Sequence, residues 1–263
     1  SVDIEGGRAA FTTLARAVKA WARARGLDSA PFGGLPGLAW TVLAARTVRE
    51  HGPLPLRDLL RRFLGDLAAW DWRRPVALTS GVAAATDPTG ATDLTDPPDA
   101  ADATDPVTIL TPTTPVRSCT TQVSAAGRDL LTQESYLAWE AAEAADALPW
   151  AALLCPPPLH RRHAAWAALS LRAVPGERFD VTLGRFRGRV RALLTALEQA
   201  GTMDAHAWPR PFDTGPDRAT YAIGLGRTPP APATLADLGR RWADGLPGVT
   251  VRWADGAELP TPG

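Results

Sequence analysis

The stretch that decides the fold class is Trp166-Ala167-Ala168-Leu169-Ser170-Leu171-Arg172-Ala173-Val174. Small and aliphatic side chains occupy every second position from 167 to 173, which is the repeat of a β-strand with one buried face. The apolar residues of the first third of the chain instead recur at steps of three and four, the repeat of helices. The sequence therefore predicts an α+β protein in which a helical lobe precedes a lobe that contains a sheet.

Further alternating and helical segments follow this strand. The periodicity predicts helices over 180–200 and 234–243, and strands over 203–208, 220–227 and 249–253. The resulting order, β-α-β-β-α-β, is the split βαβ pattern of a ferredoxin-like sandwich. We assign this lobe to residues 148–263.

The helical lobe is assigned to residues 1–147. A first amphipathic helix runs from about Phe11 to Gly26, and a glycine- and proline-rich turn separates it from the next. The remaining predicted elements are helices over 38–50, 56–67 and 124–145, with Ser124 as N-cap, and a short strand over 107–111. Short connections between the first three helices favour an antiparallel bundle.

Residues 80–106 interrupt this lobe. Ala, Thr, Pro and Gly alternate there with six aspartates, and large apolar side chains are almost absent. Such a composition buries too little surface to offset the entropy of ordering, so the segment is predicted to be a flexible acidic insert. A calcium loop is disfavoured because the turn glycine and the closing glutamate of such loops are missing.

The 263 residues carry no formal net charge, but the charge is distributed unevenly. Residues 1–79 carry a net +5, residues 80–147 a net −9 and residues 148–263 a net +4. Two mildly basic lobes are compatible with a polyanionic ligand without requiring one. Among the 28 basic residues, Lys19 is the single lysine. A compact ammonium is difficult to replace by a guanidinium where it meets a phosphate, so Lys19 is a candidate ligand contact.

Known catalytic arrangements are not recognisable in the sequence. No serine follows a nucleophile-elbow pattern, and the four histidines lack metal-ligand spacing, so we predict neither catalytic residues nor a metal site. His160 and His163 flank Arg161-Arg162 and are interpreted as part of a solvated basic turn. Gly33-Gly34-Leu35-Pro36-Gly37 precedes a helix and either presents N–H groups to a phosphate or is simply a tight connection.

The remaining features concern the compartment. No apolar run approaches the length of a membrane span, and no signal-peptide pattern is present, which indicates an intracellular, cytoplasmic protein, or a nuclear one if the source is eukaryotic. Cys119 and Cys155 are interpreted as buried free thiols, as in a reducing compartment. The chain begins with Ser1, and we expect it to have been cut from a longer parent.

Several consecutive stretches resemble motifs of the eukaryotic poly(A) polymerase family. The clearest are AVKAWARARG at 17–26, PGLAWTVLAART at 36–47 and WDWRRPV at 70–76. Similar stretches follow in the family's order at 110–115, 121–124, 189–198 and 221–225. The resemblance implies a helical central domain followed by an RRM-like RNA-binding domain. It also implies that the catalytic nucleotidyltransferase domain lies upstream, with the aspartates that bind Mg²⁺.

The resemblance further implies a function. The parent would add nucleotides, expected to be adenylate from ATP, to an RNA 3′ end, using Mg²⁺ bound by the missing catalytic domain. The partners would be RNA, a nucleoside triphosphate and the upstream domain. The chain by itself is expected to be inactive. The alternative is a non-catalytic RNA-binding module that kept the fold and lost nucleotidyl transfer. Both hypotheses remain open at the level of the sequence.

Individual residues can be placed by the same resemblance. Lys19 matches the lysine that contacts the phosphates of ATP, and Gly37-Leu38 matches a Gly-Val pair at the nucleotide. Asp28 and Ala30 depart from the family's tyrosine and asparagine, which puts the preference for adenine in doubt. In the last lobe, the strand around Tyr221 offers no paired aromatics for base stacking. RNA would then be contacted through its phosphates by Arg185, Arg189 or Arg191.

Overall fold

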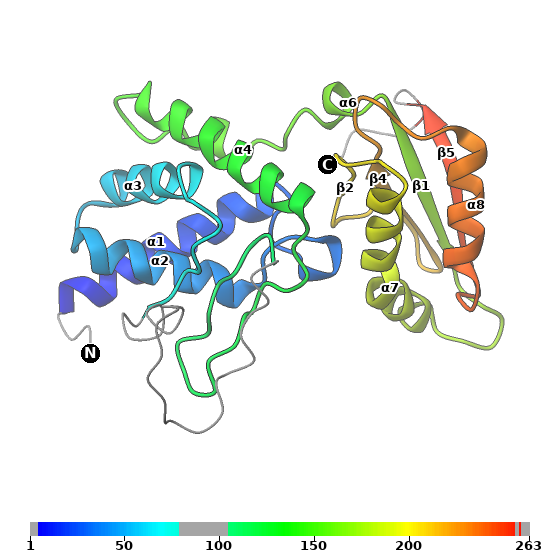
Figure 1. The fold of residues 1–263 in the computed structure, drawn as a ribbon, viewed down its shortest axis with the longest axis horizontal. Helices are drawn as coiled ribbons and strands as arrows, with labels where there is room; N and C mark the ends of the chain where they lie inside the picture. Colours follow the sequence, from blue (N-terminus) through cyan, green and yellow to red (C-terminus); the bar gives the residue numbers. More distant parts are fainter. Residues whose placement is uncertain (1–4, 79–104, 256–257, 259–263) are drawn as a thin grey trace, which may run out of the picture. The chain divides into compact units, whose positions relative to one another are not determined.

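The computed structural model describes residues 5–78, 105–255 and 258, and divides the chain into two compact units (Figure 1). The first unit comprises 1–30 and 35–155, and the second comprises 31–34 and 156–263. The first is helical and the second combines a sheet with helices, which confirms the predicted α+β class. Residues 80–104 of the predicted acidic insert lie outside the described residues. No helix in the described part is both long and apolar enough to cross a bilayer.

The first unit is built from helices whose apolar stripes face one another. Its helices are α1 (Glu5–Ala24), α2 (Gly37–His51), α3 (Leu56–Ala68), α4 (Ala125–Glu143) and α5 (Trp150–Leu153). Buried side chains such as Leu14, Trp40 and Phe63 form one continuous core. Ser124 caps α4 as predicted, because its hydroxyl accepts a hydrogen bond from the N–H of Gly127 at 3.2 Å.

The predicted strand over 107–111 is not formed. Ile109 instead makes an isolated parallel bridge with Val76, and Leu110 makes an isolated antiparallel bridge with Ser118. The apolar character of the segment has another origin, since Val107 and Ile109 are fully buried in the helical core. Alternation over so few residues reports burial and does not require a continuous ladder.

The second unit contains an antiparallel sheet. Its elements are α6 (Leu159–Arg162), β1 (Ala165–Arg172), α7 (Phe179–Gln199), β2 (His206–Ala207), β3 (Asp213–Thr214), β4 (Arg218–Gly224), α8 (Pro232–Ala243) and β5 (Val249–Asp255). The strand order is β2-β4-β1-β5, with β3 paired to β4, and β1 is antiparallel to both of its neighbours. This is the arrangement of a split βαβ sandwich, as the sequence predicts.

Two predicted strand boundaries are wrong. The strand expected over 203–208 is limited to His206–Ala207, and Met203 is 60% exposed. The strand expected over 220–227 begins earlier, at Arg218, and ends at Gly224. The short strand β3 had no counterpart in the sequence analysis, because two exposed residues carry no alternation.

The two faces of this sheet differ. Leu169, Tyr221 and Ile223 point to one face, where they pack with Phe186 of α7 and Trp242 of α8. The alternate residues point to the opposite face, which we call the open face because neither α7 nor α8 covers it. Trp166 and Trp208 lie near the start of β1, in what we call the upper part of this face. Polar residues such as Ser170 and Arg172 lie near the end of β1, in its lower part.

Residues Pro31–Gly34 belong to the second unit although they stand between α1 and α2 in the sequence. Phe32 is 6% exposed and stacks on Tyr221 with ring centroids 5.6 Å apart. It also meets the edge of Phe186 at 6.0 Å. The glycine-rich turn is therefore more than a connection, because it supplies an aromatic residue to the core of the second unit.

Candidate functional site

The amino end of α2 is open to solvent. Pro36 occupies the N-cap position and makes no side-chain hydrogen bond to the helix. Gly37 and Leu38 are exposed, Leu38 by 44%, and a Cβ atom at position 37 would meet nothing within 4 Å. The N–H groups of the first turn have no partner within an α-helix, and they carry the positive end of the helix dipole. Both properties suit an anion such as a phosphate.

Lys19 lies at the same end of the α1–α2 pair. It is an exposed residue in the last third of α1, whose neighbour Trp21 is buried. Trp21 packs edge to face against Trp40, with centroids 5.9 Å apart, and this contact fixes that part of α1 beside the first turn of α2. The predicted phosphate contacts Lys19, Gly37 and Leu38 are thus at one end of two packed helices.

Asp28 and Ala30, the two departures from the family's motif, follow α1. Both are half-buried in the turn between α1 and the start of η1 (Ala30–Phe32). An aspartate offers no flat surface to a base, and its negative charge opposes a triphosphate at short distance. The turn thus lacks the stacking group that a purine site would use.

The three candidate arginines of α7 are exposed, but they do not form one surface. Arg185 and Arg189 are four residues apart and share a side of the helix, whereas Arg191 lies two residues beyond and faces elsewhere. Arg185 is paired with Glu177, with contacts of 2.7 and 3.0 Å. Arg189 donates to the carbonyl oxygen of Asp244 at 2.9 Å. The guanidinium groups of Arg185 and Arg189 are thus engaged within the unit.

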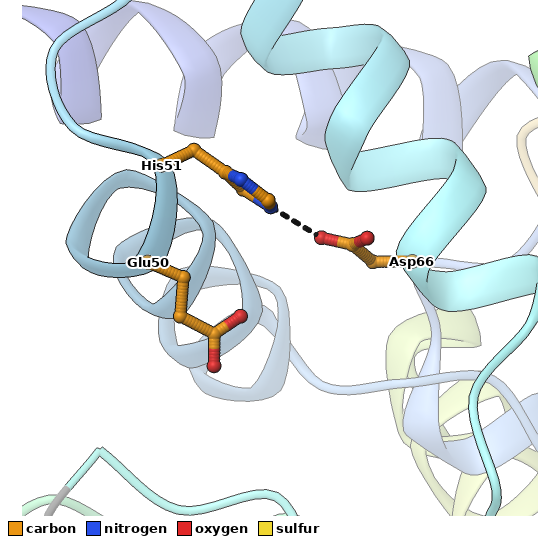
Figure 2. Close-up of side chains that lie close together, drawn as sticks. All are labelled: Glu50, His51 and Asp66. Carbon is orange, nitrogen blue, oxygen red and sulfur yellow. Dashed lines mark hydrogen bonds and ion pairs between the residues drawn. The ribbon is translucent and has the colours of Figure 1, made fainter.

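A polar cluster connects the carboxyl end of α2 to α3. His51 Nε2 lies 2.8 Å from Asp66 Oδ2, and Glu50 precedes His51 at the end of α2 (Figure 2). One ligand atom from each of Glu50, His51 and Asp66 lies within 4.8 Å of the others, which is a spacing that can hold a metal ion. This group is not apparent from the sequence, because α3 brings Asp66 beside a residue fifteen positions earlier.

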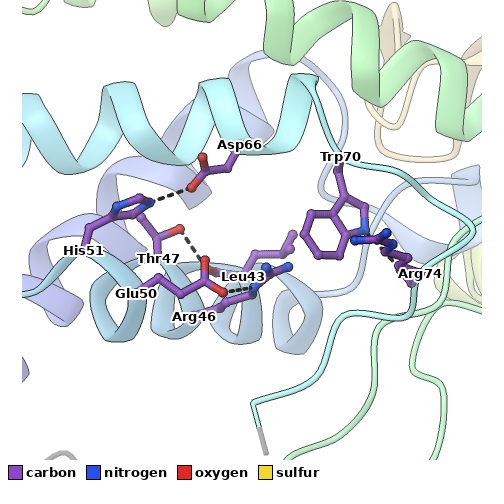
Figure 3. A network of polar contacts seen from close by, with 8 residues as sticks. All are labelled: Leu43, Arg46, Thr47, Glu50, His51, Asp66, Trp70 and Arg74. Carbon is purple, nitrogen blue, oxygen red and sulfur yellow. Dashed lines mark hydrogen bonds and ion pairs between the residues drawn. The ribbon is translucent and has the colours of Figure 1, made fainter. Parts of the chain in front are cut away.

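The contacts of Arg46 indicate that this cluster has a structural role. Its Nε donates to Glu50 Oε1 at 2.7 Å, and its guanidinium lies over the indole of Trp70, 3.9 Å from the ring centroid (Figure 3). Trp70 in turn donates from Nε1 to the carbonyl of Arg74 at 3.1 Å. A guanidinium beside Glu50 opposes a second cation there. The pocket between these side chains holds about 20 Å³, which is too small for a nucleotide.

The cluster also lies apart from the phosphate candidates. Glu50 and His51 stand at the last turn of α2, whereas Gly37 stands at the first. The rise of a helix separates these ends by about 20 Å. The carboxylates do not fit a Mg²⁺ site beside Lys19, so no step of nucleotidyl transfer is assigned to them.

The second unit contains a buried pair of histidines, His163 and His206, and the predicted position of His163 is wrong. His163 was expected in a solvated turn, but it is 6% exposed, and His206 is 7% exposed. The N–H of Gly226 donates to His163 Nδ1 at 3.0 Å, so the proton of the neutral ring is on Nε2. Burial lowers the pKa of His163 to about 4 and that of His206 to about 3. Both imidazoles are neutral at pH 7.

Aromatic residues of the open face were also missed. Trp166 and Trp208 are 0% and 1% exposed and lie on the face of the sheet opposite to Tyr221. Trp166 meets the edge of His163 at 5.0 Å between ring centroids, and Arg210 stacks over Trp208 at 4.4 Å. The strand around Tyr221 indeed presents no aromatic here, but β1 and the residue after β2 do. Since both indoles are covered, they offer no stacking platform in this conformation.

The cysteines differ from their predicted burial. Cys155 is exposed and Cys119 is half-buried, and both are free thiols. Burial raises the pKa of the Cys119 thiol, which keeps it protonated at neutral pH.

A family model described as the poly(A) polymerase central domain matches residues 10–155. The match covers more than half of the chain and includes most of α1 and all of α2 to α5. The chain belongs to the poly(A) polymerase family. The resemblance deduced from the motifs at 17–26, 36–47 and 70–76 is thereby confirmed. Within this poly(A) polymerase domain lie Lys19, Gly37 and Leu38, and also the α2–α3 polar cluster.

Proposed function

We propose that the chain is the central and RNA-binding region of a template-independent RNA 3′-end nucleotidyltransferase of the poly(A) polymerase type. Its first unit forms one wall of a nucleotide site, and its second unit binds RNA. The observation that supports this best is the open first turn of α2, where Gly37 and Leu38 are exposed in a poly(A) polymerase central domain that also contains the exposed Lys19. An uncapped helix end and an ammonium suit the phosphates of ATP.

In this proposal each residue has a limited role. The first-turn N–H groups of α2 donate hydrogen bonds to phosphate oxygens, and the absence of a side chain at Gly37 lets the nucleotide approach the backbone. Lys19 adds a point charge. Transfer itself requires Mg²⁺ held by clustered carboxylates, which a nucleotidyltransferase domain would supply.

A second candidate function is a non-catalytic RNA-binding module. Asp28 favours it, because a carboxylate stands where the family's motif has a tyrosine. The two candidates share the RNA-binding unit and differ in the nucleotide site. Binding of nucleotide therefore separates them.

The test compares ATP binding by the complete protein with that of two variants. Lys19→Ala removes the proposed contact, whereas Arg8→Ala removes another exposed cation from α1 about 16 Å away along the helix. We expect a roughly tenfold higher Kd for Lys19→Ala and no change for Arg8→Ala, measured by calorimetry. Equal affinities of all three proteins would refute the assignment. An absence of ATP binding in the unaltered protein, with RNA binding retained, would favour the second candidate.

A further inference from the structure

The lower part of the open face is polar and is built from three adjacent strands. Ser170 of β1 lies beside Thr220 of β4 and Thr250 of β5, since both pairs are in register. One row further, Arg172 of β1 is the direct partner of Arg218 of β4. Because register partners point to the same side of a sheet, three hydroxyls and two guanidinium groups share this surface.

The Arg172–Arg218 pair is unfavourable in the absence of an anion. Like charges directly opposite each other in a sheet destabilise it. Both arginines are exposed, and Arg172 has no acidic partner among the described residues. Arg218 has one distant partner, since its Nε lies 3.6 Å from Asp213 Oδ2. Such an exposed pair contributes little and leaves most of the repulsion uncompensated.

Neighbouring charges leave the surface only weakly basic, because three arginines face two carboxylates. Arg252 of β5 points to the same face, where Glu258 pairs with it at 2.7 Å. Asp213 of β3 is the register partner of Thr220, so this acidic residue lies on the same face. Guanidinium groups and hydroxyls in this arrangement are the donors that proteins use for nucleic-acid phosphates.

In the upper part of the same face the tryptophan rings are buried, so RNA bases cannot stack on them. Trp166 and Trp208 lie over Ala168 and Ala222 and are covered. A strand of nucleic acid on this face would thus meet hydroxyls and arginines and no exposed ring. Binding of this kind depends on salt and discriminates poorly between bases.

We propose that the lower open face, defined by Ser170, Arg172, Arg218, Thr220 and Thr250, binds the phosphates of single-stranded RNA. The inference rests on the proposed function, which supplies an RNA 3′ end as substrate. In this inference the RNA phosphates contact the face of the sheet opposite to α7. The earlier candidates on α7, Arg185 and Arg189, are engaged within the unit.

The test measures binding of fluorescein-labelled oligo(A) and oligo(U), about 16 nucleotides long, to the complete chain by fluorescence anisotropy. The sheet variant is Arg172→Gln with Arg218→Gln, and the matched control is Arg185→Gln with Arg189→Gln. We expect the sheet variant to bind both RNAs roughly tenfold more weakly at about 50 mM salt. Its slope of log K against log salt should fall by about 1.4, or about 0.7 for each phosphate lost. The control should retain its affinity.

Thermal unfolding distinguishes a ligand site from a structural role. Removing the like-charge pair is expected to leave Tm unchanged or to raise it, and Arg172→Lys with Arg218→Lys is expected to restore most of the affinity. Unaltered RNA binding by the sheet variant, or a loss confined to the α7 control, would overturn the inference and leave the proposed function standing. If the unaltered chain bound neither RNA, the RNA-binding part of the proposed function would fail as well.

Discussion

The imidazole of His163 occupies the space in which any residue other than glycine at position 224 would place its Cβ atom. The ring lies between Trp166 and His206 on the open face, and the backbone N–H of Gly226 holds its Nδ1. A residue from the segment before β1 thus fills a gap in β4. This contact makes Gly224 a packing requirement, although its backbone conformation is that of an ordinary strand.

Replacing this glycine should destabilise the second unit. In Gly224→Ala the added methyl group overlaps the imidazole, and overpacking of this kind costs about 1–3 kcal/mol. The control is Gly184→Ala on α7, where a Cβ meets nothing within 4 Å and alanine should stabilise the helix by up to about 1 kcal/mol. Urea unfolding of both variants measures the two changes. Equal stabilities of the two variants would contradict the packing described here.

The stability of the second unit should fall in acid. Burial lowers the pKa of His163 to about 4 and of His206 to about 3, whereas both titrate near 6.5 in the unfolded chain. Below pH 6.5 the unfolded chain takes up protons that the folded unit excludes. The stabilisation is therefore complete above pH 6.5 and is lost as the pH falls toward 4 and below.

The groups that face this pair set the size of the effect. Asp204 raises the pKa of His163, whereas Arg162 lowers the pKa of both histidines. His206→Phe keeps an aromatic ring and removes one titrating group, so its unfolding midpoint in urea should change less between pH 7 and pH 5 than that of the unaltered chain. An equal change in both proteins would show that His206 is not the group responsible.

A buried ion pair should be essential to the first unit. Arg25 Nε donates to Glu134 Oε2 at 2.5 Å, and its Nη1 donates to the carbonyl of Cys155 at 2.6 Å. Glu134 is fully buried and Arg25 is 12% exposed. Arg25→Met should lower the free energy of unfolding by about 3–5 kcal/mol, because the carboxylate of Glu134 stays buried after losing the guanidinium of Arg25.

Two further variants test this explanation. Replacing both partners, Arg25→Met with Glu134→Met, should recover most of the loss, since no charge is then left buried. Arg128→Met, which breaks an exposed pair with Asp129, should change the stability by less than about 1 kcal/mol. A double variant as unstable as Arg25→Met would argue against the ion pair as the cause.

Arg46 should contribute moderately through two contacts. Arg46→Ala removes the stacking on Trp70 and the ion pair with Glu50, and we expect a loss of about 1 kcal/mol. Arg46→Lys keeps a charge near Glu50 but loses the planar group, so it should be intermediate. Guanidinium chloride unfolding gives the order of the three proteins. A lysine variant as stable as the unaltered chain would assign the whole effect to charge.

Sequence periodicity was sufficient for the secondary structure of long elements. The helices around Trp21, Trp40 and Phe63 follow a three- to four-residue repeat, and β1 follows a two-residue repeat, because each has one buried face. Short elements were less predictable. The expected strand at 107–111 exists only as isolated bridges, since its apolar residues are buried by helices instead of by a sheet.

The sequence alone determined the fold class, the order of the long elements, the family and the identity of Lys19 as an unusual cation, because these depend on local repeats and on motifs that are continuous in the chain. Tertiary structure decided which distant residues meet: His163 with Gly224, Arg25 with Glu134, and Arg172 with Arg218. The physical reason is that burial and strand register are properties of packed elements. A local pattern can show that a residue is apolar or charged, but only the packing shows what lies against it.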